Sequence, residues 1–236
     1  FVLTPSVKQS EFYQKLTQPP PAQSAQKTAT GSVDDDAFAV TILGEQAGIA
    51  GSTGDTEDSG TVTTAIEAEA MLTAGIQDIT ASLVGEFNLN DLLRMVLETM
   101  YRSLGFTRAL LCIADARQKT MNGKIGFGLN IDQIVPHFRF PTAFAADCFH
   151  IALAKGIDIQ IDDIDADNIR QRVPTWYRTL IPAKSLVLFP LIVGGKPIGL
   201  IYADADQRNG ITIAPKELNQ LRTLRNQAVL AIKQKL

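Results

Sequence analysis

Cysteine and histidine are scarce in this chain of 236 residues, and it has no long apolar segment. Its two cysteines, Cys112 and Cys148, are too few for a disulfide framework or for a zinc site of four thiolates. The longest uncharged apolar run, 185–195, is shorter than the roughly 20 residues that a membrane span requires. Acidic residues outnumber basic ones, 25 to 22. The sequence therefore lacks the clustered excess of basic residues that is typical of nucleic-acid-binding proteins. These deficits exclude a membrane protein, a secreted disulfide scaffold and a zinc ribbon. They predict a soluble, cytoplasmic protein that binds neither nucleic acid nor membrane.

Residues 1–65 differ sharply in composition from the rest of the chain. They carry three lysines and eight acidic residues, three consecutive prolines at 19–21, and a stretch rich in Gly, Ser, Thr and Asp at 48–64. Such segments bury too little apolar surface to offset chain entropy, and consecutive prolines favour an extended spacer. Two more apolar segments, 7–16 and 37–50, could dock on a neighbouring surface. We therefore predict an interdomain linker over 1–65, largely irregular with short docking segments, and a globular domain over 66–236.

From residue 66 the hydrophobic pattern predicts an alternation of helices and strands. A first helix ends near Gly85, and a second begins after the N-cap Asn88 and stops at Gly105. Gly194 and Gly195 separate two apolar runs and predict a hairpin, because both can adopt positive φ. The other expected elements are strands at 108–114, 121–127 and 157–161, helices at 144–155 and 169–180, hairpin strands at 186–193 and 197–203, and a final helix from Pro215. Hairpins with helices gathered around them predict an α+β fold.

Short motifs in this region carry a resemblance to a known family. They are FNLNDLL at 87–93, GFTR at 105–108, SLVLFPL at 185–191, GKPI at 195–198, IYAD at 201–204 and LRTLRNQA at 221–228. Over about residues 66–236 the chain resembles a GAF-like domain, and specifically the C-terminal region of bacterial HDOD-type signal-transduction proteins. The resemblance implies a GAF-like antiparallel sheet of about six strands with helices on both faces. It also implies a small-molecule pocket on one face and no phosphohydrolase site.

Aromatic and basic residues gather in two segments, 137–140 and 176–178, that border the pocket in the GAF topology. The candidate ligand-binding residues are Phe138, Arg139, Phe144, Cys148, Trp176 and Tyr177. Aromatic rings together with arginine suit a small anionic or planar ligand, by stacking and paired hydrogen bonds. In the alternative interpretation, Phe138, Phe140 and Trp176 fill the pocket themselves.

Other motifs give weaker signals. The acidic run 162–167 has Asn168 and Pro174 where a calcium loop needs Gly and Glu, so we expect its acids to cap the following helix. His137 and His150 lack the spacing of a metal motif, and Cys148 is not followed directly by the histidine that accompanies chromophore attachment in bilin-binding GAF domains. These residues identify no catalytic group, no metal site and no cofactor.

The favoured function is a non-catalytic regulatory or sensory module of a bacterial signal-transduction protein, and so not an enzyme. It would act as a homodimer and couple to a neighbouring domain of the full-length chain. The family's first and last helices often pair with a second copy, and we expect these helices to lie side by side on one sheet face, with a dimer contact through Ile76, Leu83, Leu221 and Ile232. The alternative is a small-molecule sensor with an occupied pocket.

Overall fold

A computed structural model describes residues 41–42 and 59–235 of the chain. Most of the predicted linker therefore lies outside the described residues. The described parts of 1–65 are a two-residue strand, β1 (Thr41–Ile42), and the first turns of helix α2 (Ser59–Val84). Helix α2 thus begins before residue 66, where the globular domain was expected to start.

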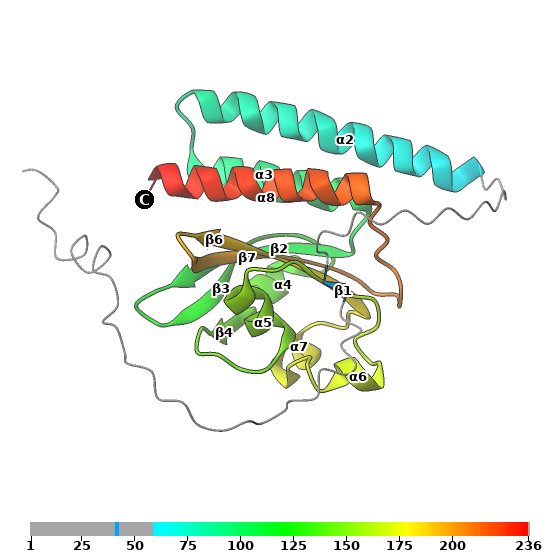
Figure 1. Ribbon diagram of the computed structural model, residues 1–236, viewed down its shortest axis with the longest axis vertical. Helices are drawn as coiled ribbons and strands as arrows, with labels where there is room; N and C mark the ends of the chain where they lie inside the picture. The colour runs from blue at the N-terminus through cyan, green and yellow to red at the C-terminus, as the bar shows by residue number, and fades with distance from the viewer. Residues whose placement is uncertain (1–40, 43–58, 236) are drawn as a thin grey trace, which may run out of the picture. The chain divides into compact units, whose positions relative to one another are not determined.

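One antiparallel sheet forms the centre of the fold (Figure 1). Its strand order is β1, β5, β6, β7, β2, β3, β4. The strands that follow β1 along the chain are β2 (Arg108–Asp115), β3 (Thr120–Gly128), β4 (Arg139–Pro141), β5 (Ile159–Ile161), β6 (Ser185–Val193) and β7 (Lys196–Ala205). The predicted α+β fold with about six antiparallel strands is confirmed, and β1 adds a short strand at the edge next to β5.

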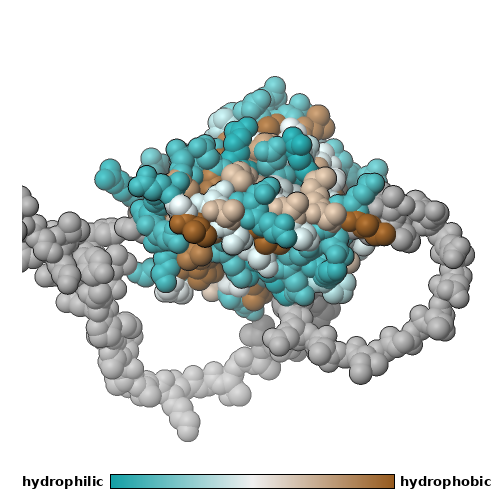
Figure 2. Space-filling view, turned by 90° about the horizontal axis from the view of Figure 1, so that it is seen from above, coloured by the Kyte–Doolittle hydropathy of each residue, from teal (hydrophilic) through white to brown (hydrophobic). Residues whose placement is uncertain are grey.

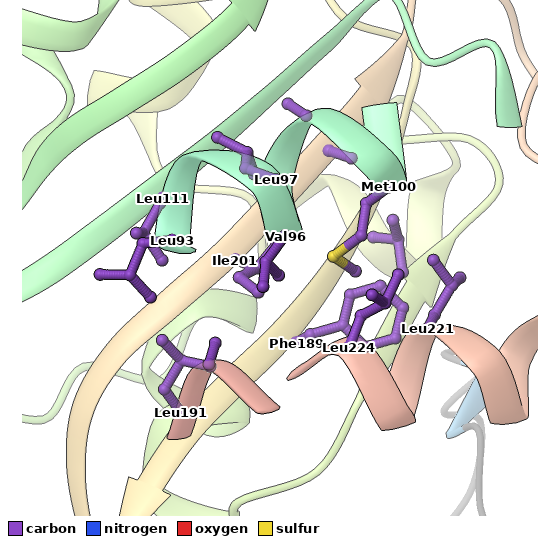
Figure 3. Packing of buried hydrophobic residues seen from close by; sticks show 14 of the residues in the cluster. Leu93, Val96, Leu97, Met100, Leu111, Phe189, Leu191, Ile201, Leu221 and Leu224 are labelled. Atoms are coloured by element: carbon purple, nitrogen blue, oxygen red, sulfur yellow. The ribbon is translucent and has the colours of Figure 1, made fainter. Parts of the chain in front are cut away.

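Helices α3 (Leu89–Leu104) and α8 (Pro215–Lys235) cover one face of the sheet, and α2 lies on top of both (Figure 1). The first and last helices lie side by side as expected, but the expectation that both pack on the sheet is wrong, because α2 rests on α3 and α8. Helix α2 forms an outer layer because α3 and α8 already bury the apolar residues on that face. Figure 3 shows this core, where Leu93, Val96 and Met100 of α3 meet Phe189 and Ile201 of the sheet.

The opposite face carries short helices and the second apolar cluster. These elements are α4 (Ile131–Ile134), the 3₁₀ turn η2 (Val135–His137), α5 (Cys148–Lys155), α6 (Asp167–Arg170) and α7 (Thr175–Leu180). Helix α5 begins at Cys148 rather than at 144, because the Asp147 side chain caps it by accepting a hydrogen bond from the His150 amide at 3.0 Å. Pro174 divides the helix expected at 169–180 into α6 and α7.

Local signals in the sequence explain where several elements begin and end. The Asn88 side chain accepts a hydrogen bond from the Asn90 amide at 2.8 Å and caps α3. Gly105 ends that helix with φ +62°. Gly194 and Gly195 adopt φ +56° and +76° in the β6–β7 turn, as a tight hairpin of this hand requires. Within the described residues, no helix combines the length and the apolar character that crossing a membrane demands.

Candidate functional site

Aromatic side chains fill the sheet face opposite α3 and α8. Phe138 and Phe140 come from the edge around β4, Phe149 from α5, and Trp176 from α7. The Trp176 ring stacks on Phe140 with centroids 5.3 Å apart and meets Phe138 edge-on at 5.3 Å. We call this group, with Tyr177 of α7 and Tyr202 of β7, the aromatic cluster: Phe138, Phe140, Phe149, Trp176, Tyr177 and Tyr202. The pairs adopt edge-on, tilted and stacked geometries typical of well-packed rings.

The structure divides the six predicted ligand-binding residues. Four of them belong to the apolar packing on this face: Phe138, Cys148, Trp176 and Tyr177. Arg139 lies on the exposed side of β4, opposite to Phe140, and donates a hydrogen bond to Gln118 Oε1 at 3.2 Å. Phe144 is 69% exposed in the loop before α5. Arg139 is therefore not next to the aromatic rings, contrary to the prediction from the sequence.

A different arginine lies beside the cluster. Arg108 of β2 is the cross-strand partner of Asp204 on β7, so both side chains project from the same face. The Arg108 Nε donates to Asp204 Oδ2 at 2.8 Å, and its Nη2 donates to Asp206. Both Arg108 and Asp204 are buried. This is a buried ion pair at the edge of the aromatic cluster.

Two tyrosine hydroxyls connect the ion pair to α7. The Tyr202 hydroxyl donates to Asp204 Oδ2, and the Tyr177 hydroxyl lies 2.9 Å from that of Tyr202. Because Tyr202 gives its single proton to Asp204, Tyr177 acts as the donor to Tyr202. We call this arrangement the buried polar chain: Tyr177, Tyr202, Asp204 and Arg108. It joins α7 to the sheet beneath the aromatic cluster.

Burial perturbs the acid in the middle of this chain. Desolvation raises the pKa of Asp204 to about 6, although the hydrogen bonds from Arg108 and Tyr202 oppose the rise. The second carboxylate oxygen, Oδ1, is buried and has no hydrogen-bond partner among the described residues. Burial also raises the pKa of both tyrosine hydroxyls well above its ordinary value. The tyrosines therefore stay protonated and act as donors at neutral pH.

The raised pKa of Asp204 predicts a pH-dependent stability. The folded state holds this proton more tightly than the unfolded chain, whose ordinary pKa is 3.8. The resulting stabilisation is complete below pH 3.8 and is lost as the pH rises through about 6. Relative to Asp204→Asn, the natural protein should lose about 2 kcal/mol of unfolding free energy between pH 4 and pH 7. Urea unfolding at several pH values measures this difference, and a difference that stays constant with pH would contradict the assignment.

The remaining candidate residues have structural contacts. Asp165 in the acidic run does not cap α6 but pairs with Arg178 and Lys184, each at 2.9 Å. The hydrogen bonds from Lys184 and Arg178 lower the pKa of Asp165 to about 2. Buried His150 lies between Asp147 Oδ2 and the Pro141 carbonyl, each 2.8 Å from a ring nitrogen. No group of three or more His, Cys, Asp or Glu in the described part of the chain is placed to hold a metal ion.

Both cysteines are buried in apolar surroundings. Cys112 lies in the middle of β2, and Cys148 begins α5. Burial raises the pKa of each thiol well above its usual range. The thiolate is the reactive form of cysteine, so this environment disfavours redox chemistry and covalent attachment at either residue.

Comparison with known proteins identifies the family. The sequence profile of the GAF domain matches residues 88–232, which is more than half of the chain. The chain belongs to the GAF domain family. The match begins at the N-cap of α3, includes β2 to β7 and ends within α8. It therefore covers the second apolar cluster, the buried polar chain and all of the first cluster except the residues of α2. No curated protein shows significant sequence similarity to it.

Solved structures of other proteins share this architecture. The GAF domain of a phosphoenolpyruvate-protein phosphotransferase from Coxiella burnetii matches with a TM-score of 0.57 at 18% identity, over 72% of this chain and 95% of that one. The free methionine-R-sulfoxide reductase of Neisseria meningitidis, solved with its substrate, matches with 0.53 at 17% identity, over 71% and 93%. A GAF domain/HD domain protein from Geobacter sulfurreducens matches with 0.52 at 12% identity, over 64% and 95%. At these identities the likeness concerns the fold alone.

Sequence reasoning missed the residues that form the buried polar chain on the sheet. Arg108, Tyr202 and Asp204 were noted only as parts of the GFTR and IYAD motifs. A signal for them does exist, because Tyr202 and Asp204 are two residues apart in a strand and so share a face. Two polar residues on one face of a strand with buried neighbours indicate a buried network when a charged partner lies opposite. That partner is identified only by the β2–β7 register.

Proposed function

We propose that this GAF domain is a non-catalytic regulatory module that pairs with a second copy and couples to a neighbouring domain. The observation that carries the proposal is the aromatic cluster, whose own side chains occupy the face that would receive a ligand. Phe138, Phe149 and Tyr177 are fully buried there, with Phe149 in ring contact with the other five members of the cluster. Because aromatic side chains occupy the face that would receive a ligand, we expect the domain to transmit a signal through contacts with other proteins or domains. On the motif resemblance, the proposed neighbour is an HDOD domain in the bacterial cytoplasm.

The outer helix layer provides the surface for pairing. Helices α2 and α8 run parallel, with Thr73 bonded to Gln220 at 2.8 Å and Thr80 bonded to Gln227 at 2.6 Å. The same register places the exposed residues Val84 and Leu230 near each other at the C-terminal ends of the two helices. Figure 2 views the molecule from this side and shows apolar patches between hydrophilic side chains. We assign the contact with a second copy to the patch that Val84 and Leu230 form.

The residues first expected at the dimer contact have different positions. Leu221 and Ile232 are buried inside the domain, against α3 and the sheet. Ile76 and Leu83 are partly buried against the same core. By contrast, Val84 is 87% exposed and Leu230 is 46% exposed. We therefore propose that the second copy binds through the exposed residues Val84 and Leu230 on the outward side of α2 and α8, instead of through the four residues first expected.

Sedimentation velocity tests the pairing. Val84→Glu combined with Leu230→Glu should turn a dimer at tens of micromolar into a monomer, since each buried leucine or valine contributes about 1.5–3 kcal/mol. That corresponds to roughly a tenfold to hundredfold weaker association for each position. Leu129→Glu is the matched control, because Leu129 is also exposed but lies after β3. A parent protein that is already monomeric, or equal dissociation by the control, would contradict the proposal.

The second candidate function is a small-molecule sensor, and the unpaired Asp204 Oδ1 favours it. An acceptor oxygen beside two tyrosine hydroxyls suits a planar ligand that donates hydrogen bonds. Such a ligand requires α7 to move, because Trp176 and Tyr177 occupy the space over the sheet.

A further inference from the structure

Apolar and polar side chains alternate along β5 and make different contacts. Ile159 and Ile161 pack in the second apolar cluster, on the sheet face opposite α3 and α8. The neighbouring polar positions contact the chain that leads into α8. Gln160 Nε2 donates to the Ile211 carbonyl at 3.1 Å, and the Asp162 carbonyl accepts from the Asn209 amide at 2.8 Å. The strand therefore holds the segment that precedes α8 at two points.

A third contact reaches α8 itself. Asp158, directly before β5, is buried and accepts hydrogen bonds from Arg222 and Arg225 of α8. The Arg222 Nε lies 2.9 Å from Asp158 Oδ2, and Arg225 binds the other oxygen, Oδ1. Residues three apart in a helix share a face, so one carboxylate can hold two successive turns. Charge-assisted hydrogen bonds of a buried acid are stronger than neutral ones.

The outer edge of β5 carries the linker strand. Strand β1 pairs antiparallel with β5, with Thr41 opposite Gln160 and Ile42 opposite Ile159 (Figure 1). On its other edge β5 pairs with β6. A strand of three residues depends on both neighbours for its position, because few ladder hydrogen bonds hold it. The same short strand thus contacts the linker on one edge and α8 through its polar positions.

We propose that β5 transmits the position of the linker to helix α8. When β1 pairs with β5, Asp158 holds Arg222 and Arg225, and the first turns of α8 are fixed on the sheet. When β1 separates from β5, the start of β5 loosens and the hold of Asp158 on α8 weakens. This relay rests on the proposed coupling function and supplies an intramolecular route for it, from the segment before the domain to its last helix.

Hydrogen exchange measured by mass spectrometry tests the relay. Thr41→Pro combined with Ile42→Pro removes both amide donors of β1. In the full chain this variant should speed amide exchange over residues 215–225 at least about tenfold, the size expected when one charge-assisted hydrogen bond is lost. Asp158→Asn should give a similar increase alone, and adding the two prolines to it should give no further increase. Asp165→Asn is the control, since Asp165 also pairs with cations, namely Arg178, Lys184 and Arg208, but none of the three belongs to α8.

Each other outcome overturns the relay. Unchanged exchange over 215–225 in the proline variant would show that β1 does not influence α8. Additive effects of the prolines and Asp158→Asn would show that the two contacts act independently, and an equal effect of Asp165→Asn would show that the effect is not specific. If Asp158→Asn fails to fold, Arg225→Gln removes one ion pair and leaves Arg222 in place. The relay is intramolecular and needs no second copy. The two prolines should therefore still speed exchange over 215–225 when they are added to Val84→Glu with Leu230→Glu, so failure of the pairing proposal and failure of the relay give different results.

Discussion

Replacing Phe149 by alanine is expected to lower the unfolding free energy by about 3–5 kcal/mol. The Phe149 ring is fully buried and lies within 6.4 Å, centroid to centroid, of five other aromatic rings. Its removal leaves a cavity that the packed rings can close only in part, so the loss includes both transfer and cavity terms. Urea unfolding followed by far-UV circular dichroism measures the loss.

The matched control for this substitution is Phe144→Ala. Phe144 is 69% exposed, so its removal should change the unfolding free energy by less than about 0.5 kcal/mol. Trp176 is the chain's single tryptophan and lies 5.2 Å from Phe149, so its emission reports on the same cluster. If the cluster fills the pocket, small anionic or nucleotide-like metabolites leave this emission unchanged. A saturable spectral change, together with a small effect of Phe149→Ala, would instead support the sensor.

The fold could be predicted largely from local signals. Asn88 and Gly105 delimit α3 in the sequence as they do in the structure, and Gly194 with Gly195 fix the β6–β7 hairpin. These residues act through their own backbone conformation and hydrogen bonds, so their neighbours in sequence suffice to predict them. Layer order has a different origin. Whether α2 packs on the sheet or on α3 and α8 depends on which apolar faces are already covered, and periodicity cannot show this.

The candidate site could be predicted only in part. Phe138, Trp176 and Tyr177 come from two segments that the sequence predicts to lie close together, and they pack in one apolar cluster. That this face binds a ligand stays a prediction. Because Arg139 is adjacent to Phe138 in the sequence, the pattern predicts that the two side chains lie together. Adjacent residues of an extended segment point to opposite sides, and Arg139 therefore faces away. The arginine beside the cluster, Arg108, is distant in sequence from both segments and is placed by strand pairing.

Arg108→Met is expected to cost about 3–5 kcal/mol of unfolding free energy at pH 7, as breaking a buried ion pair does. The substitution removes the hydrogen bond from Nε to Asp204 and leaves a buried carboxylate without its counter-charge. The cost should fall at pH 5, because a protonated Asp204 needs no counter-charge and its pKa of about 6 rises further when Arg108 is lost. Urea unfolding at both pH values measures the two costs.

Two further variants show whether charge or packing causes the loss. Arg108→Met combined with Asp204→Leu removes both charges, so it should recover most of the lost free energy and abolish the difference between pH 7 and pH 5. Arg102→Met breaks the exposed pair with Glu98 on α3 and should cost only about 0.3–0.5 kcal/mol. If Arg108→Met costs as little as Arg102→Met at pH 7, then Asp204 is already neutral there and the buried polar chain holds no ion pair. A cost that grows as the pH falls would contradict the assignment in the opposite direction, because protonation would then weaken the folded state.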